Sequence, residues 1–270
     1  MIKHSVIILT FLASVLFPLY ASAEGFPSSG FAEMRSERQA EVIEVVDANT
    51  LLLGDGRIAR LSGIDVPANE DFSVSEWQVA ARNILRDMLL AQRVQLYQTP
   101  KKDWGRTNRM GHHLMHVERM GDKAWVQGTL LKLGLARVKT EQRTPEMAAE
   151  MLALEAAARA EKLGLWAEER FKILTPEEAG GAIGRFAIVE GDVQSVTLNK
   201  NRIFINFGAN WRDDFTVTLD SAARRAFNKA GIDPMNWGNK RIRARGYLKA
   251  INGASMGVDH IAAIEVLDAP

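Results

Sequence analysis

Short apolar, β-rich runs separated by turn residues extend from Glu41 to Ile64, and this pattern predicts strands. Residues 42–46 are rich in β-branched side chains, and residues 51–53 are three leucines that run into Gly54-Asp55-Gly56, a strong hairpin signal. Residues 58–64 continue in the same style. We therefore expect a strand meander here. Further strands are expected at 94–97, 114–117 and 135–138.

Three segments have helical spacing instead. Apolar residues recur every three or four positions between Glu76 and Ala91, and a shorter helix is expected from Trp125 to Leu133. The longest helix is predicted to open at Thr144-Pro145 and to end near Leu163, with Thr144 as the N-cap and Pro145 at the first helical position. Strands mixed with helices in this order predict an α+β fold, an OB-like five-stranded β-barrel with three helices.

The second half of the chain is also rich in strands. Residues 170–184 contain Pro176 and Gly180-Gly181 and are expected to form a linker. One helix is expected at 221–231, and the rest suits a second small, mainly-β (OB-like) domain. Its strands are expected at 186–190, 192–198, 202–207, 215–219, 241–248 and 260–267.

The N-terminus has the order of a secretory signal peptide. Lys3 precedes a 15-residue apolar run, and Ala21-Ser22-Ala23 follows it, so cleavage is expected after Ala23. The run is shorter than the roughly 20 residues that span a bilayer. We expect a periplasmic or secreted protein without a transmembrane segment once the signal is removed. The expected divisions are a signal peptide (1–23), a flexible N-terminal segment (24–40), a first domain (41–169), the linker (170–184) and a C-terminal β-barrel-like domain (185–270).

Composition excludes some kinds of site. The chain has no cysteine, which excludes disulfides and thiolate metal sites. It carries 34 basic and 33 acidic residues, so loss of Lys3 with the signal peptide leaves 33 of each. Because nucleic-acid binding depends mainly on neutralised phosphates, this balance argues against a strongly basic coat protein. A local basic cleft remains compatible with it.

Five short motifs occur in a distinctive order. The motifs are Asp47-Ala48-Asn49-Thr50, then Arg60-Leu61-Ser62-Gly63-Ile64-Asp65-Val66-Pro67, Asp103-Trp104-Gly105-Arg106, Gly134-Leu135-Ala136-Arg137-Val138 and Gly164-Leu165-Trp166. Together they resemble the metal-dependent thermonuclease (staphylococcal-nuclease) family over about residues 41–168, and the resemblance implies the same fold.

The resemblance implies a role for individual positions. Arg60 and Arg106 stand where the family's two phosphate-binding arginines stand, and guanidinium groups suit phosphate because they donate paired hydrogen bonds. Asp65, Asn49 and the carbonyl of Val66 stand at the metal positions, where oxygen ligands suit calcium.

Trp104 stands where the family usually has tyrosine, and it either stacks on a nucleic-acid base or packs inside the protein.

Two departures weaken the expected chemistry. Asn49 replaces a metal-binding aspartate, so any calcium is expected to bind weakly. Ala68 replaces the glutamate that activates water, and Glu70 is the candidate surrogate base if the loop is shifted. We expect a pocket for nucleic acid or another phosphate-bearing ligand, with hydrolysis weak or lost. The alternatives are an active calcium-dependent nuclease using Glu70, and a non-catalytic scaffold of the cell envelope whose protein partner the sequence does not identify.

The C-terminal region contains the motifs Asn206-Phe207-Gly208, Trp211-Arg212, Asp214-Phe215-Thr216, Arg243-Ala244-Arg245-Gly246 and Asn252-Gly253. With these motifs it resembles the β-domain appended to many bacterial thermonuclease-like envelope proteins. Four of its residues are candidates for a stacking and phosphate-binding surface. The alternative is a core tryptophan with solvated arginines. These residues are Trp211, Arg212, Arg243 and Arg245.

Overall fold

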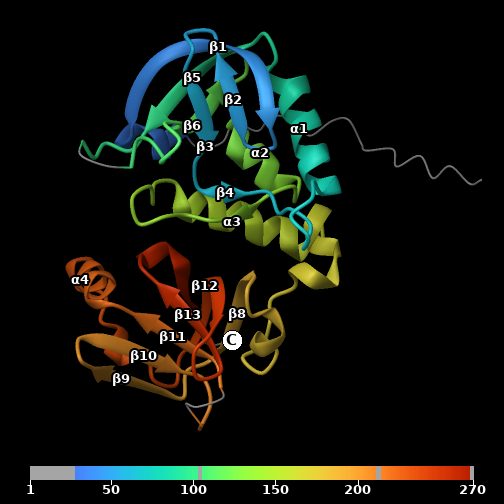
Figure 1. The fold of residues 1–270 in the computed structure, drawn as a ribbon. Helices are drawn as coiled ribbons and strands as arrows, with labels where there is room; N and C mark the ends of the chain where they lie inside the picture. Colours follow the sequence, from blue (N-terminus) through green and yellow to red (C-terminus); the bar gives the residue numbers. More distant parts are fainter. Residues whose placement is uncertain (1–27, 103–104, 211–213, 268–270) are drawn as a thin grey trace, which may run out of the picture.

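The computed structural model describes residues 28–102, 105–210 and 214–267. Two β-rich regions follow one another along the chain, and helix α3 (Ala148–Ala160) lies on the side of the first region that faces the second (Figure 1). The expected signal peptide lies outside the described residues. No helix within the described ranges is long and apolar enough to cross a membrane.

The first region is a closed five-stranded barrel, as predicted. Its strand order is β1-β2-β3-β6-β5, with β3 and β6 parallel and the other neighbours antiparallel. Apolar side chains that alternate along the strands fill the interior, and Leu51, Leu53 and Leu96 are fully buried. The strands are β1 (Arg35–Asp47), β2 (Thr50–Leu53), β3 (Ile58–Leu61), β5 (Arg93–Gln98) and β6 (His113–Arg119).

Strand β1 starts earlier than the pattern indicated. Residues 35–37 and Ala40 pair with β5, although the sequence boundary for this domain was placed at residue 41. Each side chain from Arg35 to Gln39 is polar, and most are exposed, so no alternation marks this end of the strand. Backbone pairing with β5 extends it.

Two helices of the first region match the expected periodicity. Helix α1 (Glu76–Leu89) begins at a capping box, in which Ser75 accepts from the N–H of Gln78 while the Gln78 side chain accepts from the N–H of Ser75. It buries Ala81, Leu85 and Leu89 against the barrel. Helix α2 (Val126–Lys132) packs beside α3.

The predicted start of α3 was wrong. The helix begins at Ala148 rather than at Thr144-Pro145, because Met147 has a left-handed φ of 61° that interrupts any earlier turn. The preceding Glu146 accepts a hydrogen bond of 2.6 Å from the Thr99 hydroxyl. A contact between remote segments thus overrides the local capping signal.

The second region is a seven-stranded sheet with one helix. Its strand order is β14-β12-β13-β11-β10-β9, and β8 also pairs with β12. Helix α4 (Ser221–Lys229) is capped by Asp220 and buries Phe227 against Trp237. Strand β13 was not predicted. The strands are β8 (Phe186–Asp192), β9 (Ser195–Asn199), β10 (Arg202–Asn206), β11 (Thr216–Leu219), β12 (Arg241–Ala250), β13 (Ala254–Val258) and β14 (Ile264–Leu267).

Candidate anion-binding site

The side chain of Arg60, on β3, contacts residues at the turn between β1 and β2. Thr50 and Arg60 are cross-strand partners, and the Arg60 guanidinium donates a 2.9 Å hydrogen bond to the Thr50 hydroxyl. Its NH1 also lies 3.6 Å from Oδ2 of Asp47, whose Oδ1 accepts from the Asn49 N–H at 2.8 Å. The Arg60 side chain keeps 37% of its surface exposed. The turn therefore orients this arginine while leaving its charge accessible.

Asp65 lies opposite Arg137 in a short two-stranded sheet of β4 (Ile64–Asp65) and β7 (Arg137–Val138). The Nε and NH2 of Arg137 lie 2.9 and 2.8 Å from Oδ2 of Asp65. Lys139 Nζ lies 3.8 Å from the other oxygen. Both oxygens of the predicted metal ligand therefore face cations of the protein itself.

The second domain covers these two cations with aromatic rings. Arg137 lies 4.4 Å from the centre of the Phe186 ring and donates to the Phe186 carbonyl at 3.4 Å. Lys139 lies 5.2 Å from the centre of the Tyr247 ring. Cations over ring faces are attracted by the ring quadrupole, so the rings favour the positions that Arg137 and Lys139 take around Asp65.

The loop after β4 is tied down on both sides. The Ser75 hydroxyl donates to the Pro67 carbonyl at 2.6 Å, and the Gln78 amide donates to the Val66 carbonyl at 3.3 Å. The Val66 carbonyl, a predicted metal ligand, thus already accepts a protein hydrogen bond. Ala68 lines the cleft and contributes no proton acceptor from its side chain.

Glu70, the candidate surrogate base, points to the second domain. Its Oε1 lies 2.9 Å from NH1 of Arg185, whose NH2 donates to the Gly181 carbonyl at 3.0 Å. Both side chains are well exposed, so the pair is of the weak kind found at protein surfaces.

The Arg106 guanidinium is engaged by backbone groups. It donates to the carbonyls of Thr99 and Pro100, at 3.3 and 3.2 Å, and Arg106 is not among the described residues that line the cleft around Arg60. An anion pocket shared by Arg60 and Arg106 therefore stays a prediction. Trp104 lies outside the described residues.

A cleft of about 1530 Å³ contains Arg60, Asp65 and Glu70. One wall is the first domain, including a face of α1, and the opposite wall comes from the linker and the second domain. Arg82 and Arg86, one turn apart on α1, line it, and no ion pair joins either to a carboxylate within the described ranges. Their spacing of four was visible in the sequence, whereas Arg137, Arg185 and Tyr247 reach the cleft only through the tertiary fold.

The residues present do not fit a calcium ion in this arrangement. Calcium prefers several oxygen ligands with carboxylates among them. Asn49 is neutral, Asp65 is engaged by Arg137, and the Val66 carbonyl accepts from Gln78. Across the residues that the structure describes, no group of three His, Cys, Asp or Glu side chains is placed to hold a metal.

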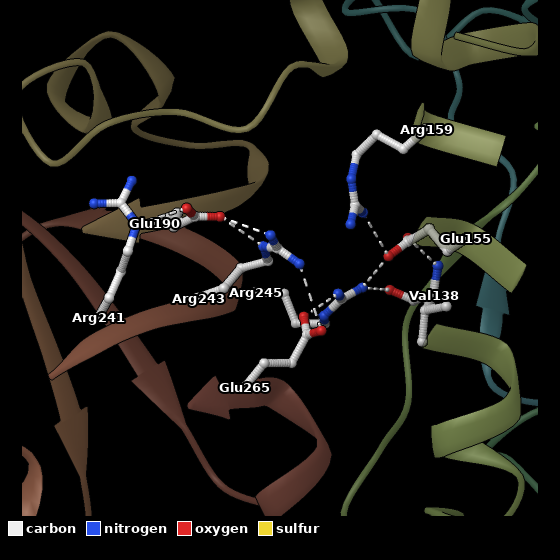
Figure 2. A network of polar contacts seen from close by, with 8 residues as sticks. All are labelled: Val138, Glu155, Arg159, Glu190, Arg241, Arg243, Arg245 and Glu265. Carbon is white, nitrogen blue, oxygen red and sulfur yellow. Dashed lines mark hydrogen bonds and ion pairs between the residues drawn. The ribbon is translucent and has the colours of Figure 1, made fainter. Parts of the chain in front are cut away.

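Two arginines of the predicted nucleic-acid surface, Arg243 and Arg245, are already engaged by carboxylates of the protein. Arg245 is 4% exposed and pairs with Glu155 of α3 at 2.7 Å and with Glu265 at 2.8 Å (Figure 2). Burial alone would lower the pKa of Arg245, but the charges of Glu155 and Glu265 outweigh it and raise that pKa. Arg243 pairs with Glu190 at 2.7 Å. Neither arginine offers an open phosphate-binding surface.

The other two residues of that predicted surface, Trp211 and Arg212, lie outside the described residues.

One comparison with known families identifies the first domain. Residues 58–168 match the family model of the staphylococcal nuclease homologues. The match confirms the resemblance seen in the sequence motifs, and it spans β3, all three helices of the first region and the Gly164-Leu165-Trp166 motif. No curated protein matches the chain.

Proposed function

We propose that this chain, which carries a staphylococcal-nuclease-homologue domain, is an exported protein that binds phosphate groups of nucleic acid or of another phosphate-bearing ligand, with hydrolysis weak or lost. The observation that carries the proposal is how two side chains in one cleft are engaged by other groups of the protein. Arg60 is oriented and exposed, while Asp65 is held by Arg137. The cleft therefore retains a cation for phosphate and engages the carboxylate that would recruit a metal.

Binding of an anion is favoured by the charges along the cleft. Arg60 is paired only loosely with Asp47, at 3.6 Å, and Arg82 and Arg86 extend the basic surface along α1. Phosphate groups that contact these side chains release counterions, which is the main source of affinity for nucleic acids. Three accessible guanidinium groups suit a short stretch of strand rather than a long, coated polymer.

Weak hydrolysis follows from the missing base. Ala68 cannot accept a proton, and assistance by a general base is typically worth about 10²- to 10⁴-fold in rate. With Asn49 in place of aspartate, we expect calcium to bind weakly, because affinity rises with the number of charged ligands.

The alternative is an active calcium-dependent nuclease in which Glu70 acts as the base. One observation keeps it testable, since the Glu70–Arg185 pair is exposed and such pairs stabilise by only about 0–1 kcal/mol. Release of Glu70 would therefore be easy. A third role, as a non-catalytic scaffold of the cell envelope, would need neither binding nor cleavage.

A binding and cleavage assay on the purified chain 24–270 separates these functions. The probe is a fluorescein-labelled single-stranded 12-mer, used with millimolar calcium and again with a chelator. We expect binding in both conditions, reduced about tenfold by Arg60→Ala, and little or no cleavage. Arg57→Ala is the matched control, because Arg57 lies on the same hairpin, pairs with Asp55 and does not line the cleft.

Other outcomes would point to the other functions. Strong calcium-dependent cleavage that is lost in Arg60→Ala and Glu70→Gln would establish the active nuclease instead. No binding of the 12-mer or of inorganic polyphosphate would leave the scaffold as the better account. Asn49→Asp with Ala68→Glu tests the reason for weak hydrolysis, since this pair is expected to raise the cleavage rate.

A further inference from the structure

The cleft that holds Arg60 is closed on one side by a different domain. Its far wall includes Arg185, Phe186 and Tyr247, which come from the start of β8 and from β12. A ligand that reaches Arg60 therefore also meets side chains that the family match at 58–168 does not include. Whether this wall is a movable lid or a fixed part of the site depends on how the two domains are joined.

A buried charge network joins them. Arg245 of β12 reaches Glu155 of α3 and the Val138 carbonyl, and Glu155 also accepts from the backbone N–H of Val138 at 2.8 Å (Figure 2). The Glu155 side chain is 0% exposed and that of Arg245 is 3% exposed. Separation of the domains would break the 2.7 Å pair between Arg245 and Glu155, leaving Glu155 with Arg159 at 3.2 Å and Arg245 with Glu265, and breaking a buried pair is unfavourable.

Apolar and polar contacts support the same junction. Ile188 of β8 is buried in one cluster with Ala158, Leu165 and Trp166 of the first domain. On the other side of the interface, the Thr140 hydroxyl and Nε2 of His260 are 2.8 Å apart. The second domain is therefore held in a constant position, and the wall it contributes is preorganised, which lowers the cost of ordering a ligand.

The wall offers two kinds of contact that suit one kind of ligand. The Arg185 side chain is 45% exposed and exchanges its weak partner Glu70 readily. Tyr247 is 49% exposed, and its ring lies at the cleft beside Lys139. A cation suits phosphate, and an exposed aromatic ring suits a flat base, so the combination is the one used to hold single-stranded nucleic acid.

We propose that the C-terminal domain forms half of the binding site, with Arg185 and Tyr247 as specificity-determining residues for single-stranded nucleic acid held against Arg60. The proposal rests on the proposed function and deepens it. The phosphate of the strand contacts Arg60 on one wall and Arg185 on the other, and one base stacks on Tyr247. The domain outside the family match thus selects a strand with bases over a bare polyphosphate.

Two probes and five variants test the proposal in the intact chain. The probes are a fluorescein-labelled 12-mer of oligo-dT and an abasic 12-mer of the same length. Arg185→Ala is expected to weaken both probes about fivefold, because it removes a phosphate contact. Tyr247→Ala is expected to weaken oligo-dT about tenfold and to leave the abasic strand unchanged, because stacking needs a base.

The controls distinguish stacking from damage to the fold. Tyr247→Phe keeps the ring and should bind oligo-dT like the unmodified chain. Arg202→Ala removes an exposed arginine of β10 that does not line the cleft, and should change neither probe. Thermal unfolding of each variant checks that the domains stay folded.

The results distinguish the composite binding site from the proposed function on which it rests. If Arg60→Ala weakens oligo-dT while Arg185→Ala and Tyr247→Ala bind normally, the composite site is overturned and the anion cleft stands. Equal loss on both probes in Tyr247→Ala overturns the stacking role. Normal binding in Arg60→Ala would overturn the proposed function itself.

Discussion

Arginine meets carboxylate in two regions of this molecule, with different consequences. At the domain interface the Arg245 and Glu155 side chains are 3% and 0% exposed and lie 2.7 Å apart. In the cleft the Arg60 and Asp47 side chains are 37% and 51% exposed and lie 3.6 Å apart. Both pairs join a guanidinium to a carboxylate, and they differ mainly in burial and geometry.

This difference separates a structural role from a binding role. A buried charge cannot exchange its partner for water, so Arg245 is committed to Glu155 and Glu265. An exposed charge exchanges its partner at little cost, so Arg60 and Arg185 can turn to a ligand. The buried ion pairs hold the two domains together. The exposed ion pairs leave the cleft between the domains available to a ligand.

The largest effect on stability is expected from the buried ion pair at the domain interface. Arg245→Ala should lower the free energy of unfolding by up to about 3–5 kcal/mol, because it removes the 2.7 Å partner of buried Glu155 and leaves only Arg159, at 3.2 Å. Urea unfolding followed by circular dichroism measures the change. Arg202→Ala serves as the exposed control, with a change within about 0.5 kcal/mol. A loss below about 1 kcal/mol in Arg245→Ala would remove the contrast between the two regions.

A second buried group should make the first domain sensitive to acid. His116 of β6 is 1% exposed, and burial lowers its pKa from 6.5 to about 3. Since the unfolded chain binds a proton at higher pH than the folded one, stability is full above pH 6.5 and is lost as the pH falls toward 3. At pH 5 this residue alone should lower the free energy of unfolding by about 2 kcal/mol relative to neutral pH.

The variant His116→Leu measures that contribution. It should flatten the dependence of unfolding free energy on pH between about 6.5 and 4, whatever its effect on stability at pH 7. His113→Leu, on the same strand but partly exposed, is the matched control for a leucine substitution on β6. Parallel pH profiles for His116→Leu and the unmodified chain would contradict the assignment.

Salt should weaken ligand binding in the exposed cleft more than it weakens the buried ion pairs at the domain interface. Raising the salt concentration from about 50 to 200 mM should weaken oligo-dT binding about tenfold, as expected for two or three phosphate contacts on a single strand. The midpoint of thermal unfolding should move little over the same range, because buried pairs are poorly screened. Fluorescence anisotropy and calorimetry give the two quantities. Salt-independent binding would argue against Arg60, Arg82 and Arg86 as phosphate contacts.

The smallest effect is expected for the pair across the cleft mouth. A double-mutant cycle with Glu70→Ala and Arg185→Ala should give a coupling energy of about 0–1 kcal/mol, because both side chains are exposed. Urea unfolding of the four proteins supplies the cycle. A coupling above about 2 kcal/mol would mean that this pair acts as a structural lock, as Arg245 and Glu155 do.

Elements with a strong local pattern could be predicted from the sequence. Helix α1 has apolar spacing and a capping box, and the barrel strands carry apolar runs bounded by turns, so these elements were expected where they lie, apart from the first residues of β1. Strand β13 was missed because its five residues, Ala254–Val258, carry small and flexible side chains with no clear alternation. The start of α3 was misplaced because a contact between Glu146 and Thr99 overrides the local signal.

The candidate site was predictable only in part. The motifs place Arg60, Asn49, Asp65 and Ala68 in one region, and the cleft does contain all four. No motif indicates that Arg137 would engage Asp65, or that Glu70 would face Arg185 from another domain. Arg245 was a candidate for a surface and lies in the interior, since nothing local distinguishes a buried arginine from an exposed one.

The sequence by itself determined the family of the first domain, the five-stranded barrel and the two substitutions that weaken the metal and the base. These depend on residue identity and on periodicities of two and 3.6 residues, which are local properties of a chain. The tertiary structure alone decided which charged side chains are buried and which are exposed to solvent. It also decided that the second domain forms a wall of the cleft. Burial depends on what remote segments bring together, and it is burial that decides whether an arginine holds the protein together or remains free to bind.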